Sequence, residues 1–126
     1  MSAPSAPRPS QPGAYRAPSA LSVIAEQRGP WVVLVLSGEL DLATAPQLLG
    51  HIAGILQAGP PARMALELSG LTFCDSSGLN AFVRIWKRTI AIGGEFVLLS
   101  PPPKVARYLQ TTGMYQQITV VAALPE

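Results

Sequence analysis

The segment Asp75-Ser76-Ser77-Gly78 contains the residues of this sequence that are best suited to regulatory chemistry. It separates a hydrophobic strand and loop from an amphipathic segment, so its hydroxyls fall at the start of a predicted helix. The unpaired N–H groups and the dipole of a helix start favour negative charge there. Asp75 or Ser76 could cap the helix, a contribution of about 1 kcal/mol. A phosphoserine would also fit these N–H groups and would block a docking surface by bulk and charge. Both roles are open and compatible.

The other reactive residue types give little support for enzymatic chemistry. His51 is the single histidine, and its spacing places it on the polar face of a helix, without the partners that a metal site or a hydrolytic triad requires. Asp41 and Asp75 each lie at a strand-to-helix junction, where a carboxylate more often caps the helix. Cys74 is the single cysteine, interpreted as a small, partly buried thiol, so no internal disulfide can form. We therefore expect no enzyme, no metal and no cofactor.

Hydrophobic periodicity predicts the elements that must position these residues. The expected strands are residues 21–24, 31–37, 64–68, 95–100 and 118–122, and the expected helices are 45–58, 77–92 and 104–112. Thr44 and Gln47 are expected to form a capping box, residues 69–75 a loop, and Ile90 part of a buried helix face. This order predicts an α/β domain with a mostly parallel sheet of about five strands, flanked by helices and opened by an N-terminal β-hairpin.

Composition and charge reduce the number of function classes that the chain could belong to. With 126 residues, 48% hydrophobic and 13% charged, the chain is expected to form one domain over residues 20–126, with a monomer as the default. Arg8 and Arg16 carry the net charge of +2, because residues 20–126 hold seven basic and seven acidic side chains, so no nucleic-acid partner is expected. The proline-rich residues 1–19 are predicted to be a disordered tail. No signal sequence or membrane-spanning run is present, so we expect a cytoplasmic protein without direct membrane insertion.

An ordered set of motifs resembles STAS domains, the sulfate transporter and anti-sigma-factor antagonist family. Gly38-Glu39-Leu40-Asp41 with Thr44-Ala45 resembles the first signature of that family, and Leu71 to Leu79 resembles the second and more specific one. Gly93 to Phe96 and Val105 to Gly113 match the remaining pattern in order and spacing. The resemblance covers roughly residues 20–124. One departure is Cys74, where family members more often carry an apolar residue, which leaves redox sensitivity open.

A free-standing STAS domain of this size resembles the bacterial anti-sigma factor antagonists. The resemblance implies that the unphosphorylated protein binds a serine-kinase anti-sigma factor and frees the sigma factor. It also implies that the kinase switches the protein off by phosphorylating Ser77 and that a PP2C-type phosphatase restores it. The residues implied at the kinase interface or bordering it are Asp41, Asp75, Ser76, Gly78, Arg84 and Lys87. The alternative is a constitutive STAS subunit of a lipid-transport ATPase or of a stress-signalling complex.

Overall fold

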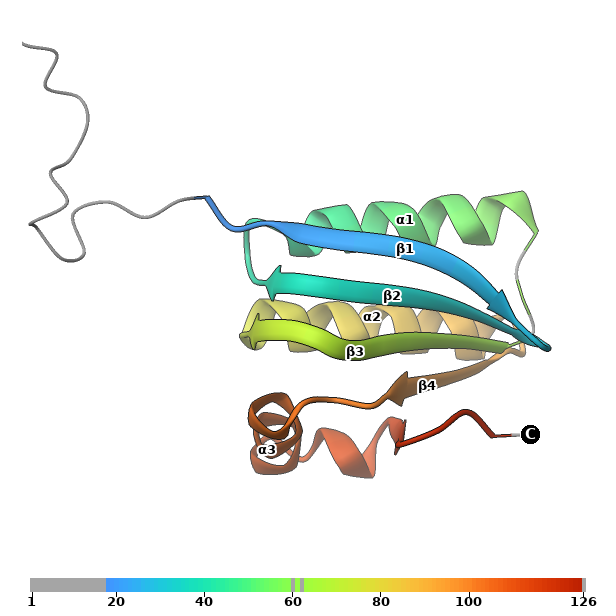
Figure 1. The fold of residues 1–126 in the computed structure, drawn as a ribbon. Helices are drawn as coiled ribbons and strands as arrows, with labels where there is room; N and C mark the ends of the chain where they lie inside the picture. The colour runs from blue at the N-terminus through green and yellow to red at the C-terminus, as the bar shows by residue number, and fades with distance from the viewer. Residues whose placement is uncertain (1–17, 60, 62, 126) are drawn as a thin grey trace, which may run out of the picture.

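A computed structural model describes residues 18–59, 61 and 63–125, and the predicted tail over residues 1–19 lies almost entirely outside this range. The elements are β1 (Leu21–Arg28), β2 (Trp31–Leu40), α1 (Ala45–Ala58), β3 (Arg63–Cys74), α2 (Ser76–Ala91), β4 (Glu95–Leu99), α3 (Pro103–Thr111), a short 3-10 helix η1 (Met114–Gln116) and β5 (Thr119–Val121) (Figure 1). They form one sheet in the order β1-β2-β3-β4-β5. The β1–β2 pair is antiparallel and the other pairs are parallel. The predicted α/β class, with its opening hairpin, is confirmed.

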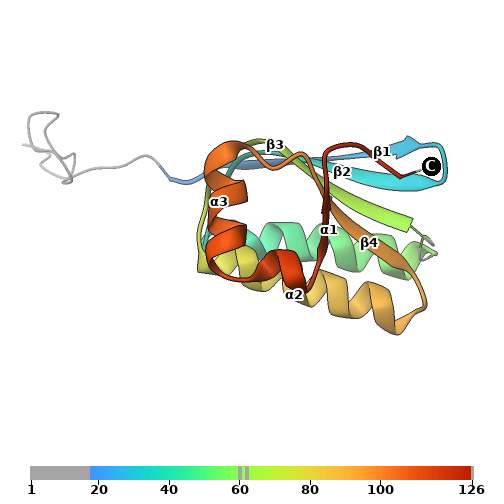
Figure 2. The ribbon, with the colours of Figure 1, turned by 90° about the horizontal axis from the view of Figure 1, so that it is seen from below.

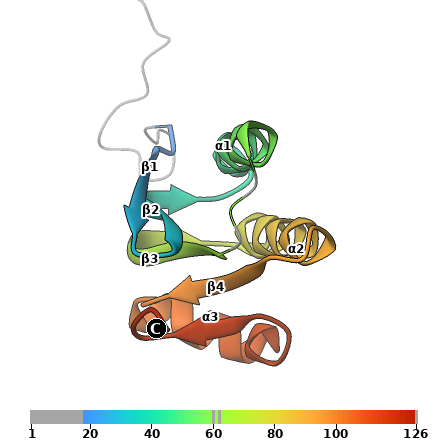
Figure 3. The same ribbon diagram turned by 90° about the vertical axis from the view of Figure 1, so that its right-hand side faces the viewer.

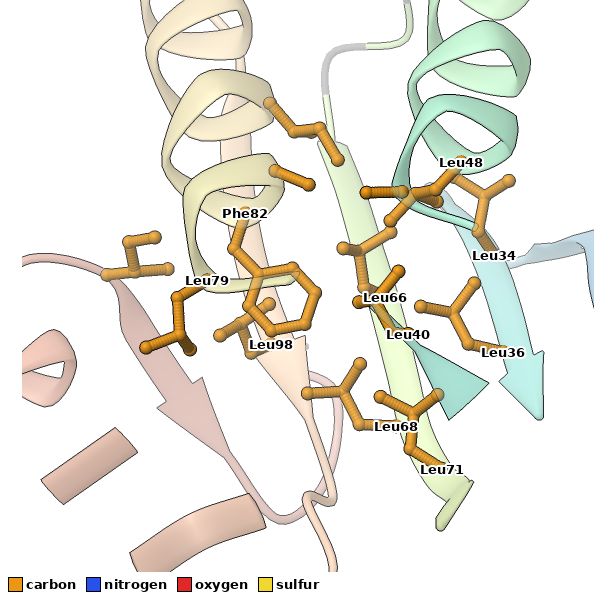
Figure 4. Close-up of a cluster of buried hydrophobic side chains, with 14 of the residues drawn as sticks. Leu34, Leu36, Leu40, Leu48, Leu66, Leu68, Leu71, Leu79, Phe82 and Leu98 are labelled. Atoms are coloured by element: carbon orange, nitrogen blue, oxygen red, sulfur yellow. The ribbon is translucent and has the colours of Figure 1, made fainter. Parts of the chain in front are cut away.

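Helices α1 and α2 cover one face of the sheet, and α3 lies on the β4 side of the domain, away from α1 (Figures 2 and 3). Alternate residues of the strands point toward these helices because side chains of a strand alternate between its two faces. The core between the layers consists of fully buried side chains, among them Leu34, Leu36, Leu66, Leu68, Leu98, Leu48, Ile52, Phe82 and Ile85. They belong to one cluster of buried side chains, and Figure 4 shows its leucines and Phe82 gathered between the helices and the sheet. Among the described residues, no helix combines the length and apolar character needed to cross a bilayer.

The opposite face of the sheet has a smaller apolar cluster, which the C-terminal segment covers. Trp31, Val33, Ala65 and Val97 are buried there, and Leu124 packs against them. The indole N–H of Trp31 donates a hydrogen bond to the Pro125 carbonyl at 3.1 Å. These contacts fix the C-terminal end of the described chain beside the first residue of β2.

Three local predictions were wrong. The expected loop at residues 69–75 is mostly strand, because β3 continues to Cys74 beside the end of β2, with register shifts that keep the two paired. Thr44 and Gln47 form no capping box: Thr44 Oγ1 donates to the Glu39 carbonyl at 2.8 Å, and Gln47 Nε2 donates to the Leu21 carbonyl at 2.8 Å. Ile90 is 51% exposed, and the buried position beside it belongs to Thr89, whose hydroxyl bonds the Ile85 carbonyl.

Gly38 allows the start of β1 to approach the end of β2. It has φ of +105°, a region that favours glycine, and a Cβ at this position would lie 2.3 Å from the Ala20 carbonyl oxygen. The next residue, Glu39, donates its backbone N–H to that same oxygen at 2.9 Å. The residue type at position 38 therefore decides how the chain enters the sheet.

Substituting Gly38→Ala should lower the free energy of unfolding by about 2 kcal/mol or more, because the methyl group is strained by its φ and overlaps the Ala20 carbonyl. The matched control is Gly50→Ala, an exposed position within α1 where a Cβ meets nothing within 4 Å. That change should raise stability by about 0.5–1 kcal/mol, the helix advantage of alanine. Urea unfolding of both variants measures the two effects, and equal stabilities would contradict this account of Gly38.

Candidate functional site

The loops that begin α1 and α2 meet at one edge of the sheet. They follow β2 and β3, which are adjacent and parallel, and their last residues, Leu40 and Cys74, are partners in the register. The backbone N–H of Asp75 donates to the Leu40 carbonyl at 3.3 Å, which joins the two loops directly. Binding sites of α/β folds commonly form at such carboxyl ends of neighbouring strands.

Asp75 is the N-cap of α2; the sequence had predicted either Asp75 or Ser76 for this role. Its backbone is extended, and its Oδ1 accepts hydrogen bonds from the N–H of Ser77 at 2.9 Å and of Gly78 at 3.3 Å. The helix begins at Ser76, which is exposed, and Ser77 follows half-buried. Among the hydrogen bonds of the described residues, Ser77 takes part through its backbone N–H and not through its hydroxyl.

Gly78 and Cys74 form the packed floor beneath this helix start. Gly78 is buried, and a Cβ there would lie 2.7 Å from Cys74 Sγ and 3.0 Å from the Leu40 side chain. Gly78 therefore acts through close packing rather than by presenting a surface. Burial raises the pKa of the Cys74 thiol to about 12, and the nearby Asp75 carboxylate adds to that rise. Cys74 is thus a partly buried, protonated thiol, as expected, and thiolate chemistry is disfavoured there.

Asp41 orders the turn that leads into α1. Its Oδ1 accepts the backbone N–H groups of Ala43 at 3.0 Å and Thr44 at 3.1 Å, and its Oδ2 accepts the hydroxyl of Ser19. The Ser19 hydrogen bond and these backbone donors hold the pKa of Asp41 below its ordinary value, against a smaller opposing effect of desolvation. With its carboxylate occupied in this way, Asp41 fixes the turn, and the next residue, Leu42, is left 78% exposed.

A groove runs between the first turns of α1 and α2 and contains the Ser77 position. Its lining consists of Leu42, Ala45, Pro46, Leu49, Ser77, Asn80, Ala81 and Arg84. The α1 wall is apolar and the α2 wall is largely polar, with Arg84 the charged residue of the lining. Lys87 lies further along α2, exposed and outside the lining.

Sequence reasoning missed the apolar wall of the groove. Leu42 lies between Asp41 and the start of α1, so it is not part of the hydrophobic periodicity of that helix. This position in the sequence could have predicted that the leucine is exposed. Leu49, in α1, is half-buried: it packs against the core and also lines the groove. His51 is exposed, as predicted. Among the described residues, no three His, Cys, Asp or Glu side chains gather in a way that would hold a metal ion.

Comparison with known proteins assigns the family. The family model described as "STAS domain" matches residues 22–126. The anti-sigma F factor antagonist of Lysinibacillus sphaericus is 31% identical over 83 residues, which cover 66% of this chain and 71% of that protein. The chain belongs to the STAS domain family of anti-sigma factor antagonists.

Solved structures share the STAS fold over most of their length. An anti-sigma factor antagonist from Mycobacterium paratuberculosis superposes with a TM-score of 0.76 at 25% identity, covering 87% of this chain and 92% of that one. The Bacillus cell fate determinant SpoIIAA in its phosphorylated form gives a TM-score of 0.62 at 25% identity, covering 79% and 90%. The STAS architecture predicted from the motifs is confirmed.

Substituting Asp75→Ala should lower the free energy of unfolding of this STAS domain by about 1 kcal/mol, because two N–H groups of α2 lose their acceptor. The matched control is Asp75→Asn, whose side-chain oxygen can still cap the helix and should retain most of the stability. Thermal unfolding at neutral pH measures both variants. An alanine variant as stable as the wild type would show that the cap contributes nothing.

Proposed function

We propose that this STAS domain is an anti-sigma factor antagonist controlled by phosphorylation of Ser77. The unphosphorylated protein binds a serine-kinase anti-sigma factor and thereby frees the sigma factor. The kinase transfers the γ-phosphoryl group of ATP to Ser77 Oγ, releasing ADP and the hydroxyl proton, and the complex then dissociates. A PP2C-type phosphatase hydrolyses the phosphoserine and restores binding.

The observation that carries this proposal is the position of Ser77 in the groove between α1 and α2. Among the hydrogen bonds of the described residues, Ser77 takes part through its backbone N–H, which Asp75 holds together with that of Gly78, and not through its hydroxyl. A phosphate there would sit at the positive end of α2, which tolerates negative charge, so the domain would keep its fold. The same phosphate would occupy the groove and lie close to Asp75, which suits a switch that blocks docking without unfolding.

The residues around Ser77 suggest how a partner would bind. Leu42 is exposed beside the groove and gives an apolar anchor of the kind that dominates protein interfaces. Arg84 lines the α2 wall and can pair with acidic groups of the partner, while Lys87 extends the basic surface along the helix. The carboxylates of Asp41 and Asp75 order the backbone of the two loops, and Gly78 lets α2 start close to Leu40. Ser76 is exposed in the first turn of α2, next to Ser77.

The relatives support the same proposal. Their names describe them as antagonists of anti-sigma factors, and SpoIIAA has been solved in unphosphorylated and phosphorylated forms. Such a function is binding and regulation rather than catalysis by this chain. The proposed location is the cytoplasm, where the kinase, the sigma factor and the phosphatase would act.

The direct test of the switch is the intact mass of the protein after incubation with ATP and a serine-kinase anti-sigma factor. The wild type and Ser76→Ala should each gain one phosphate, and Ser77→Ala should gain none. Ser76 is the matched control because it is the exposed neighbour in the same helix turn. Phosphate on the Ser77→Ala variant would overturn the site assignment, and stable copurification with a membrane permease without any phosphorylated form would favour the constitutive-subunit alternative.

Substituting Leu42→Ala should weaken binding of the unphosphorylated protein to the anti-sigma factor by about tenfold or more, because an interface anchor is lost. Its effect on the free energy of unfolding should stay within about 0.5 kcal/mol, since the side chain is 78% exposed. Ile24→Ala is the matched control, a 57% exposed residue of β1 away from the groove lining. Calorimetric titration compares the affinities, and equal losses for the two variants would argue against Leu42 as an anchor.

A further inference from the structure

We propose that Ser19 is a positioning residue for the turn formed by Asp41–Thr44, and that it couples the segment before β1 to the partner-binding groove. The coupling to a partner rests on the proposed function, whereas the positioning of the turn does not. The residue precedes the first strand and lies outside both motif loops.

Three successive residues at the start of the described domain are held by the end of β2 and the start of α1. Ser19 donates its hydroxyl to Asp41 Oδ2. The Ala20 carbonyl accepts the N–H of Glu39 at 2.9 Å, and the Leu21 carbonyl accepts Gln47 Nε2 at 2.8 Å. The Ser19 bond is the only one of these three that engages the Asp41 side chain.

The carboxylate of Asp41 transmits this contact to the turn. Its Oδ1 is already held by the N–H groups of Ala43 and Thr44, so the hydrogen bond to Oδ2 fixes the rotation of the carboxylate as a whole. A fixed carboxylate keeps these two N–H groups in place and so keeps Leu42 at the mouth of the groove. Holding a binding turn in its bound shape before association lowers the entropy cost of binding.

The proposed role belongs to the hydroxyl group and not to the bulk of the side chain. Ser19 is half-buried, and its neighbours Pro18 and Ala20 are exposed, so an alanine at position 19 would disturb little packing. Threonine retains the donor and should restore the contact. The causes that shift the pKa of Asp41 are hydrogen bonds from Ser19, Ala43 and Thr44 together with desolvation, and no other charged side chain is among them.

The test compares Ser19→Ala, Ser19→Thr and Ser22→Ala. Ser22 is the matched control, an exposed serine of β1. Carbon-detected NMR titration should give a higher pKa for Asp41 in Ser19→Ala, because the hydrogen bond that lowers it most is gone. Exchange of the Ala43 and Thr44 amides should become about three- to tenfold faster, the equivalent of one modest hydrogen bond. Ser19→Thr and Ser22→Ala should behave like the wild type.

Phosphorylation kinetics with the serine-kinase anti-sigma factor test the coupling to the partner. Ser19→Ala should raise KM for this protein about three- to tenfold with little change in kcat, since docking and not phosphoryl transfer is affected. Unchanged titration and exchange would overturn the positioning role, and changed exchange with unchanged KM would overturn the coupling. A wild type that is not phosphorylated at all would count against the proposed function, while the NMR measurements would still decide whether Ser19 positions the turn.

Discussion

The parallel pairing of β2 with β3 runs to the last residue of each strand, and the candidate site depends on that extension. Because Leu40 and Cys74 are partners, the two loops that follow leave the sheet side by side and are joined by the bond from Asp75 N–H to the Leu40 carbonyl. A shorter β3 would separate α1 from α2 at their first turns and would remove the groove. Gly78 completes the arrangement, because its missing side chain lets α2 start directly over Leu40 and Cys74.

Two aspartates serve the same structural purpose in the two loops. In each, one oxygen, Oδ1, accepts two successive backbone N–H groups, those of Ala43 and Thr44 for Asp41 and those of Ser77 and Gly78 for Asp75. Their negative charges are therefore engaged within the domain. The side chains left free to contact a partner at the groove are therefore the apolar Leu42 and the cationic Arg84. The backbone that carries them is already held in place by the two aspartates.

Much of this arrangement follows from local patterns in the sequence. The strand and helix order and the cap at Asp75 rest on periodicity and capping chemistry, which act over a few residues, whereas the two motif loops were recognised by their resemblance to STAS domains. Two of the errors arose where distant segments decide the outcome: Gly70 looks like part of a turn but pairs with Ser37 of β2, and Gln47 bonds Leu21 instead of closing a capping box. The Ser19 contact spans 22 residues, and no periodic pattern could reveal it.

The two ends of the described chain lie at opposite ends of β2. Ser19 meets Asp41 just after the last residue of that strand, while Pro125 meets Trp31 at its first residue, ten residues and about 30 Å away. A fluorescent protein or affinity tag that replaced residues 1–17 would therefore be attached close to Asp41 and the groove. One fused after the C-terminus would be attached beside Trp31, at the end of β2 away from the groove. The candidate site and the C-terminal attachment point therefore lie at opposite ends of the domain.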